Sequence, residues 1–271
     1  MTYNMLTCNL MGGLGNQLFQ MAASFGAAEK YNRTLVFYLP RCHKASHTNI
    51  KHLFSLFPTI PFVDVGHAEW HEISEKSFAT FEPLPPTIPE LPVVLRGFRQ
   101  SEKYFRLQNI TLDFKHSLGE SEYNRLTDLG KSLNVDASAF LHVRRGDYTF
   151  LPHHQVNLEN YWVTSIRHIQ STGQTKLLIF SDDSEYVENV MLPFFTQFSQ
   201  EYVVLHEGPI ATLYLMSLCG TGAICANSTF SWWGAYLSVA KRRKAPICMP
   251  AKWGDFNTPD IYPEWATVVD V

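Results

Sequence analysis

The chain has 271 residues, of which 45% are hydrophobic and 17% are charged. This composition is typical of a folded globular protein and argues against a disordered chain or a coiled coil. Lysine and arginine total 22 against 25 aspartates and glutamates, and the resulting formal charge of −3 gives no support to a protein that coats nucleic acid. Any anion-binding site must therefore be local.

The amino-terminal residues, the apolar stretches and the cysteines bear on the cellular compartment. Residues 1–13 lack the basic start, apolar stretch and cleavage site of a signal peptide. No window reaches the roughly 18 consecutive apolar residues of a membrane-spanning helix. The five cysteines are odd in number and form no C-x-x-C pair, so neither a disulfide framework nor a zinc site is expected. We expect buried thiols in a reducing compartment and a cytoplasmic protein, with peripheral membrane contact left open.

The first part of the chain predicts a strand–helix–strand unit. Residues 5–10 read as a strand, 11–17 (MGGLGNQ) as a glycine-rich turn that leads into a helix, and 34–39 as a second strand. The turn lacks the last glycine of the dinucleotide fingerprint and the Gly-Lys-Ser/Thr end of a P-loop. Dehydrogenases and ATPases of those types are therefore disfavoured.

A domain boundary is expected near residue 135. Residues 40–90 read as irregular, with a proline-rich stretch at 82–92, followed by a strand at 93–98 and a helix at 118–134. We therefore expect one Rossmann-like domain over residues 1–135 and another over 136–271.

The second half alternates strands and helices more regularly. Strands are predicted at 139–143, 175–181, 202–206, 223–226 and 245–250, and helices at 157–171, 181–191, 211–219 and 227–240. Such alternation predicts a doubly wound α/β domain with a parallel sheet.

Three predicted strand ends carry polar clusters. The residues are His142, Arg144, Arg145 and Asp147 after the first strand, Ser181, Asp182 and Asp183 after the second, and Asn227, Ser228, Thr229, Phe230 and Ser231 after the fourth. The carboxyl ends of parallel strands share one edge of the sheet, so these clusters are expected to converge on one ligand. Paired arginines suit phosphate oxygens, and hydroxyls with N–H groups at a helix start suit the remaining ones. The pattern predicts a site for a nucleotide diphosphate.

Structural readings of the same residues stay open. Asp182 could read a guanine edge or cap a helix, and Ser228 and Thr229 could also be caps. Trp232 and Trp233 fall inside a predicted helix and are expected in the core. The Asp182–Asp183 pair suits Mg²⁺ or Mn²⁺, but the arginines could neutralise the phosphates instead, and we expect no metal.

Six segments together resemble the GDP-fucose α-1,2-fucosyltransferases. They are GGLGNQLFQ (12–20), GFRQSEKYF (97–105), HVRRGDY (142–148), FSDD (180–183), LYLMSLC (213–219) and NSTFSWWGAYL (227–237). They occur in the family's order between about residues 7 and 253, so the combination is specific although each segment alone is weak. Residues 208–212 depart from the family by lacking an acidic residue before LYLMSLC, which bears on the choice of acceptor.

The resemblance implies an α/β fold of the GT-B type, with two Rossmann-like domains facing across a cleft. Residues 1–135 would form the acceptor side, and residues 136–271 would bind GDP-fucose. It implies transfer of L-fucose from GDP-fucose to the 2-hydroxyl of a glycan acceptor, such as a terminal β-galactoside, with inversion and without a metal or other cofactor. By position, Arg144 resembles the arginine on the β-phosphate, and His142 with Asp182 or Asp183 the guanine-reading pair. Ser228, Thr229 and Phe230, flanked by Asn227 and Ser231, resemble the loop around the phosphates and base. Asn16 and Gln17 resemble residues that approach the fucose from the first domain.

The sequence does not decide which residue is the general base or which residue Arg145 contacts. Asp147 is the leading candidate to take the acceptor's proton, with Glu159, His153 and His154 as alternatives. Asp147 could instead pair with Arg145 and brace the loop. A fucosyltransferase of another linkage, a protein O-fucosyltransferase, a transferase for another nucleotide sugar and a non-catalytic sugar-binding module are the competing functions.

Overall fold

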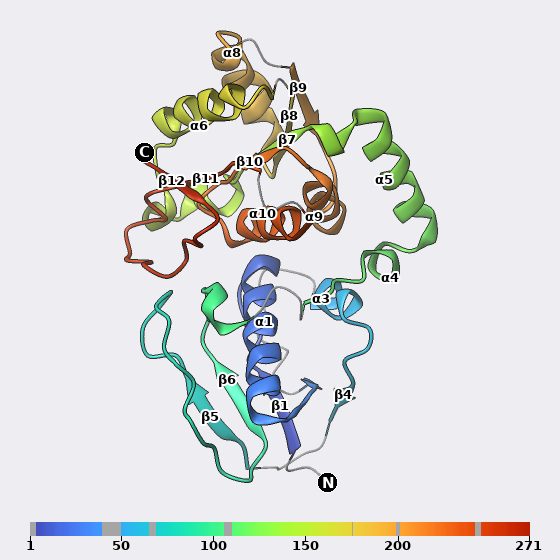
Figure 1. Cartoon of the computed structure of the whole chain (residues 1–271), viewed down its shortest axis with the longest axis vertical. Coiled ribbons are helices and arrows are strands. Elements are labelled where there is room, and N and C mark those ends of the chain that lie inside the picture. Colours follow the sequence, from blue (N-terminus) through green and yellow to red (C-terminus); the bar gives the residue numbers. More distant parts are fainter. Residues whose placement is uncertain are drawn as a thin grey trace. The chain divides into compact units, whose positions relative to one another are not determined.

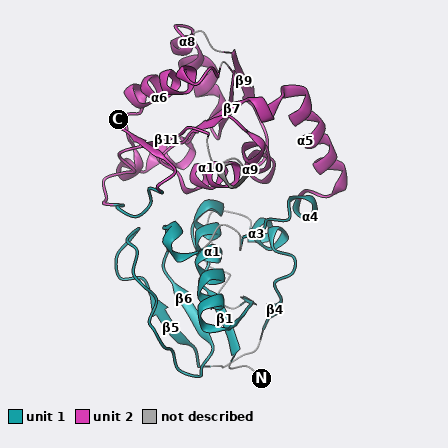
Figure 2. Cartoon of the chain, viewed as in Figure 1, with its two compact units in different colours: residues 1–117, 258–263 teal, residues 118–257, 264–271 magenta. Residues whose placement is uncertain are grey.

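The computed structural model describes residues 4–39, 50–64, 69–105, 110–174, 176–198, 201–241 and 245–271 (Figure 1). These residues form two compact units, which Figure 2 shows in different colours. The first comprises residues 1–117 and 258–263, and the second comprises residues 118–257 and 264–271. The division falls at 117/118 rather than near 135.

The first unit contains a four-stranded parallel sheet of order β2-β1-β6-β5. Its strands are β1 (Met5–Cys8), β2 (Thr34–Leu35), β5 (His71–Ser74) and β6 (Val93–Arg96), and β3 (Phe37–Tyr38) pairs separately with β4 (Phe62–Val63). Its helices are α1 (Leu14–Tyr31), α3 (Ile50–Leu56) and α4 (Phe114–Leu118), with a 3-10 turn at Glu102–Tyr104. The chain thus contains the predicted strand–helix–strand unit.

Two expectations for this unit were wrong. The strand predicted at 34–39 is divided at Val36 into β2 and β3, which pair with different partners. The stretch 40–90 is not irregular throughout, because it contains α3, β4 and β5. The edge strand β5 buries only Ile73, so it carries no apolar alternation that the sequence could show.

The second unit contains a six-stranded parallel sheet of order β12-β11-β10-β7-β8-β9. The strands are β7 (Ala139–Val143), β8 (Lys176–Ser181), β9 (Glu201–Leu205), β10 (Gly222–Ile224), β11 (Ile247–Pro250) and β12 (Thr267–Val269). The helices are α5 (Glu120–Leu133), α6 (Glu159–Ser171), α7 (Ser184–Tyr186), α8 (Leu192–Phe195), α9 (Pro209–Leu218) and α10 (Thr229–Lys241), and a π-helical turn (Val187–Met191) joins α7 to α8. The predicted doubly wound domain is confirmed.

Helix α5 belongs to this second unit, although the sequence placed it before the boundary. Leu126 is fully buried, and the Thr127 hydroxyl lies 3.0 Å from the Tyr214 hydroxyl on α9. Arg125 also forms an ion pair with Glu207. These contacts join α5 to α9 and to Glu207 just before it, within the second unit.

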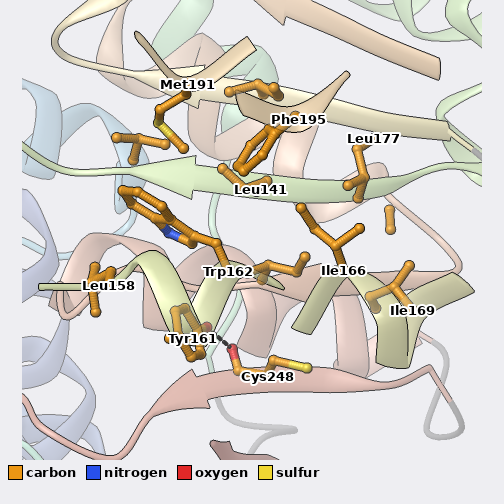
Figure 3. Close-up of a cluster of buried hydrophobic side chains, with 14 of the residues drawn as sticks. Leu141, Leu158, Tyr161, Trp162, Ile166, Ile169, Leu177, Met191, Phe195 and Cys248 are labelled. Carbon is orange, nitrogen blue, oxygen red and sulfur yellow. Dashed lines mark hydrogen bonds between the residues drawn. The ribbon is translucent and has the colours of Figure 1, made fainter. Parts of the chain in front are cut away.

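The central strand β7 has different partners on its two faces, because successive side chains of a strand point to opposite sides. Leu141 and Val143 join the cluster around Trp162 of α6 that Figure 3 shows. His142 lies on the other face, 5.5 Å from the Phe230 ring of α10 between ring centroids. Figure 1 shows α6 on one side of this sheet and α9 with α10 on the other.

Two buried aromatic groups fix the helices to the sheet. The Tyr161 hydroxyl is 2.7 Å from the Cys225 carbonyl oxygen and 2.8 Å from that of Cys248, the second contact being drawn in Figure 3. Trp232 and Trp233 of α10 are fully buried, as predicted. Cys8, Cys219, Cys225 and Cys248 are buried, as predicted for the thiols, and Cys42 lies outside the described residues.

Candidate active site

The three polar clusters follow three neighbouring strands. The order β10-β7-β8 places β7 between the other two, with Leu141 paired to Ile224 and Val143 paired to Ser181. The carboxyl ends of these strands therefore meet at one edge, which confirms the predicted neighbourhood of the three strand ends.

Arg144 lies between two carboxylates. Its Nη2 is 2.5 Å from Oδ1 of Asp147, and its Nη1 is 2.5 Å from Oδ2 of Asp182. Asp182 Oδ1 also accepts the backbone N–H of Arg145 at 2.8 Å. These two side-chain contacts use two of the five N–H donors of a guanidinium, so the group keeps donors for a further anion.

Arg145 does not pair with Asp147, the alternative that the sequence left open. Arg145 Nε instead donates to Oδ2 of Asp183 at 3.0 Å, and the guanidinium carbon lies 3.6 Å from the Tyr186 ring centroid. Asp147 is three residues after Arg144 and meets it across the 3-10 turn at Gly146–Phe150. Residues three apart lie on the same side of such a turn.

The two adjacent aspartates have different roles. Asp183 caps α7 by accepting the Tyr186 backbone N–H at 3.0 Å. That hydrogen bond, and then the one from Arg145, lower the pKa of the Asp183 carboxyl. The capping role considered for Asp182 thus belongs to Asp183, while Asp182 contacts Arg144.

Gly146 allows Asp182 to approach the loop closely. A Cβ atom at position 146 would lie 2.4 Å from Asp182 Oδ2, a distance that real Cβ contacts do not reach. The loop continues to Tyr148, whose hydroxyl donates to the Asn227 carbonyl at 3.2 Å and whose pKa burial raises to about 12. The loop is thereby joined to the end of β10.

His142 is 5% exposed, and its Nδ1 has no hydrogen-bond partner among the described residues. Burial, and then the nearby charge of Arg144, lower the pKa of His142 from 6.5 to about 3. The imidazole is therefore neutral at physiological pH.

The lowered pKa of His142 predicts a pH-dependent stability. Between the unfolded pKa of 6.5 and the folded pKa of about 3, only the unfolded chain gains this proton, so the free energy of unfolding falls as the pH falls. We expect His142→Asn to lose less unfolding free energy between about pH 7 and pH 4 than the parent does. Denaturant titrations across that range measure the slopes. The exposed His168→Asn is the control and should keep the parent slope; an unchanged slope in His142→Asn would contradict the assignment.

The segment after β10 is held by its own hydrogen bonds. Asn227 Nδ2 donates to the carbonyls of His154 and Trp253, both at 3.0 Å. The Ser231 hydroxyl accepts the Ala226 N–H at 3.0 Å. These two side chains support the loop, whereas Ser228, Thr229 and Phe230 stand at the start of α10, where the Ser228 carbonyl accepts the first helical hydrogen bond from Trp232.

Asn16 and Gln17 lie in the first turn of α1, in the first unit. Asn16 Oδ1 accepts from Gln100 Nε2 at 2.9 Å, and Gln17 Nε2 donates to the Gly12 carbonyl at 2.9 Å. Gly12 has a positive φ of 73°, and a Cβ there would lie 2.4 Å from Asn16 Nδ2. The glycine is thus required by the approach of Asn16.

A cavity of about 400 Å³ opens beside Arg144 and Arg145. Its walls include Tyr148, His154 and Tyr186, and Glu159 and Trp162 from the start of α6. Of the alternative base candidates, Glu159 and His154 line this cavity. Tyr148, Trp162 and Tyr186 were not predicted as site residues. Trp162 has the spacing of a core residue, and no local pattern marks Tyr148 or Tyr186 as part of a pocket.

Two features are absent from the described part of the chain. No helix in it is both long and apolar enough to cross a membrane. In the same residues, no three histidine, cysteine, aspartate or glutamate side chains are grouped closely enough to hold a metal ion.

Comparison with known families identifies the kind of protein. A sequence model described as Glycosyl transferase family 11 matches residues 2–265. The chain belongs to glycosyl transferase family 11. The strand-end cluster, within these matched residues, is therefore the candidate active site of a family 11 glycosyltransferase.

Named relatives of this family 11 protein are transferases. Over 261 residues it is 26% identical to an α-1,2-colitosyltransferase of Escherichia coli, covering 86% of this chain and 88% of that protein. It is 28% identical over 254 residues to a putative galactoside 2-α-L-fucosyltransferase, svh-11, of Caenorhabditis elegans, covering 84% and 67%. A segment of 121 residues is 37% identical to the E. coli O-antigen biosynthesis glycosyltransferase WbnK, but it covers only 42% of this chain and 38% of WbnK.

Solved structures of POFUT1 share the fold of the family 11 chain. The complex with GDP-fucose gives a TM-score of 0.50 at 13% identity, covering 87% of this chain and 93% of that one. A complex with GDP gives 0.51 at 12% identity, covering 87% and 94%. At such identities the likeness shows the α/β fold with parallel sheets and nothing more.

Proposed function

We propose that this protein transfers L-fucose from GDP-fucose to the 2-hydroxyl of a glycan acceptor such as a terminal β-galactoside, forming an α-1,2 linkage with inversion. The observation that carries the proposal is the convergence of Arg144, Arg145 and Asp182 at the adjacent ends of β7 and β8 in a family 11 chain. The fucosyl and colitosyl relatives support the sugar and the linkage.

Arg144 is the group we assign to the departing diphosphate. As the C1–O bond to the β-phosphate breaks, negative charge grows on the GDP oxygens, and a fixed guanidinium beside them stabilises the transition state. Two carboxylates hold Arg144 in place in the absence of that anion. Its remaining donors are those that would contact the phosphate.

We assign the guanine to the side of β7 that carries His142. The neutral imidazole beside Phe230 offers a planar contact, and its Nδ1 has no hydrogen-bond partner in the described part of the chain. A carboxylate such as Asp182 can accept from base N–H groups. Ser228, Thr229 and the N–H groups at the start of α10 are suited to phosphate oxygens. Asn227 and Ser231 act by holding that loop.

The proposal includes a GT-B arrangement, in which Asn16 and Gln17 approach the fucose from the first unit. The likeness to the POFUT1 complexes supports this arrangement at the level of the fold. Because arginines and N–H groups supply positive charge, the proposal also includes transfer without a metal.

A colitose donor is the second candidate, because one relative that aligns over most of its length is a colitosyltransferase. Colitose is fucose without the 3-hydroxyl. A site that hydrogen-bonds this hydroxyl would discriminate strongly against the sugar that lacks it.

A transfer assay tests the proposal. The purified chain is incubated with GDP-fucose or GDP-colitose against lactose, lacto-N-biose and N-acetyllactosamine, with and without excess EDTA, and the product linkage is determined by NMR. We expect an α-1,2-fucosylated product at equal rates in both conditions. Preferential use of GDP-colitose would contradict the proposed donor, and a product of another linkage would contradict the α-1,2 linkage. Loss of turnover in EDTA that Mn²⁺ restores would contradict transfer without a metal.

A further inference from the structure

The cavity beside Arg144 lies on the α6 side of β7. Val143 lines it and belongs to the buried cluster with Trp162, which also lines it. His142 points to the opposite face, toward Phe230. The cavity and the proposed guanine contact are therefore on opposite sides of the strand.

Arg144 is close to both the cavity and His142, which lie on opposite faces of β7. It lines the cavity, and its charge contributes to the lowered pKa of His142. If Arg144 contacts the β-phosphate, the donor sugar is bonded next to it. Inversion requires the acceptor oxygen to approach C1 from the side opposite to the departing GDP. Arg144 lines the cavity, so a sugar bound in the cavity lies next to the group assigned to the β-phosphate.

The cavity also has the chemical groups that a sugar needs. Glu159 is exposed in the first turn of α6, and no hydrogen bond or ion pair of its carboxylate is found among the described residues. Trp162 follows three residues later on the same helix face and also lines the cavity, while its indole N–H is buried and has no partner within the described part of the chain. A carboxylate acceptor beside aromatic rings is a combination of polar and apolar groups expected in small-ligand sites, and a volume of about 400 Å³ is within their range.

Asp147 is less suited to the same task. Its carboxylate is engaged with the guanidinium of Arg144, whereas Glu159 has no such partner in the described residues. A carboxylate that is free to accept a hydrogen bond is available to orient an incoming hydroxyl.

We propose that this cavity binds the reacting pyranose of the glycan acceptor and that Glu159 accepts the proton of its nucleophilic hydroxyl. The inference rests on the proposed fucosyl transfer. The acceptor oxygen forms the bond to C1 of fucose, the C1–O bond to the β-phosphate breaks, GDP leaves with that electron pair, and the proton passes to the Glu159 carboxylate. The reacting sugar would then be bound by the second unit rather than by domain 1–135, where the sequence analysis placed the acceptor.

Steady-state kinetics with GDP-fucose and the best acceptor test this inference, together with calorimetry of GDP binding. Glu159→Gln is expected to lower kcat/KM for the acceptor about 100-fold or more, while the Kd for GDP changes less than about twofold. Trp162→Phe, which makes the aromatic wall of the cavity smaller, is expected to raise the acceptor KM several-fold. Glu185→Gln, another exposed first-turn glutamate, is the matched control and should behave like the parent.

The outcomes separate the alternatives. A raised Kd for GDP in both cavity variants with unchanged acceptor KM would assign the cavity to the nucleotide and overturn the inference. The inference would also be overturned if both variants kept the parent's kcat/KM and KM for the acceptor and its Kd for GDP. A parent protein that neither binds GDP nor transfers fucose would instead contradict the proposed function itself.

Discussion

Replacing Arg144 with alanine is expected to lower kcat/KM for fucosyl transfer about 10³-fold, equivalent to about 4 kcal/mol of transition-state stabilisation. The side chain is the one cation held jointly by Asp147 and Asp182 at the strand edge, among the residues that the structure describes. Steady-state kinetics measure the loss. The fold should persist, because ion pairs this exposed to solvent contribute little to stability.

Arg125→Ala is the matched control for this experiment. Arg125 is also an arginine of the second unit that contacts two carboxylates, those of Glu122 and Glu207, but it lies on α5 and does not line the cavity. We expect near-parent turnover in this variant. Equal activity of Arg144→Ala and Arg125→Ala would show that Arg144 has no special role in transfer.

Replacing Gly146 with alanine is expected to lower kcat/KM about 100-fold without touching any charged group. The new methyl group would lie 2.4 Å from Asp182 Oδ2, so either the loop or the carboxylate must move. The loop and the Asp182 carboxylate together determine where Arg144 lies. A displacement of about 1 Å at a catalytic group can lower the rate about 100-fold. Kinetics and a thermal unfolding curve on the same sample separate loss of activity from loss of fold.

Gly208→Ala provides the comparison, because no atom lies within 4 Å of a Cβ at that position. It should retain activity within about twofold, since its cost is confined to the start of α9. Parent-like kinetics in Gly146→Ala would mean that the close approach of Asp182 to this loop is not needed for transfer.

The sheet of the second unit and the location of the site could be predicted well from the sequence. The strand at 139–143 has the predicted ends because five apolar or neutral side chains, Ala139 to Val143, are all buried between two helical layers. Once the sheet is parallel, the ends of its strands must share an edge, and this brings Arg144 and Asp182 together from positions far apart in sequence. The burial of Trp232 and Trp233 followed from their place inside an apolar helix.

The partners of the two arginines could not be predicted. They depend on the backbone of the residue that enters the 3-10 turn, Arg145, whose φ of −133° and ψ of −60° lie outside the regular regions. That geometry brings Asp147 to Arg144 and leaves Arg145 to Asp183. A linear motif contains no information about such a turn.

The cavity was missed for a related reason. Trp162 has the spacing of a core residue and is indeed mostly buried, so nothing in the helical pattern marks one edge of its ring as part of a cavity wall. Tyr186 belongs to a short helix whose position depends on the cap made by Asp183. Sites assembled from the edges of several core elements leave little trace in local sequence.

Titration of GDP into the purified full chain, in EDTA and followed by calorimetry, tests the central claim that the strand-end cluster around Arg144 holds the nucleotide diphosphate. We predict saturable one-to-one binding without a metal, weakened at least about tenfold in Arg144→Ala and unchanged in Arg125→Ala. Absence of binding by the parent, or equal affinity of the parent and both variants, would contradict the account.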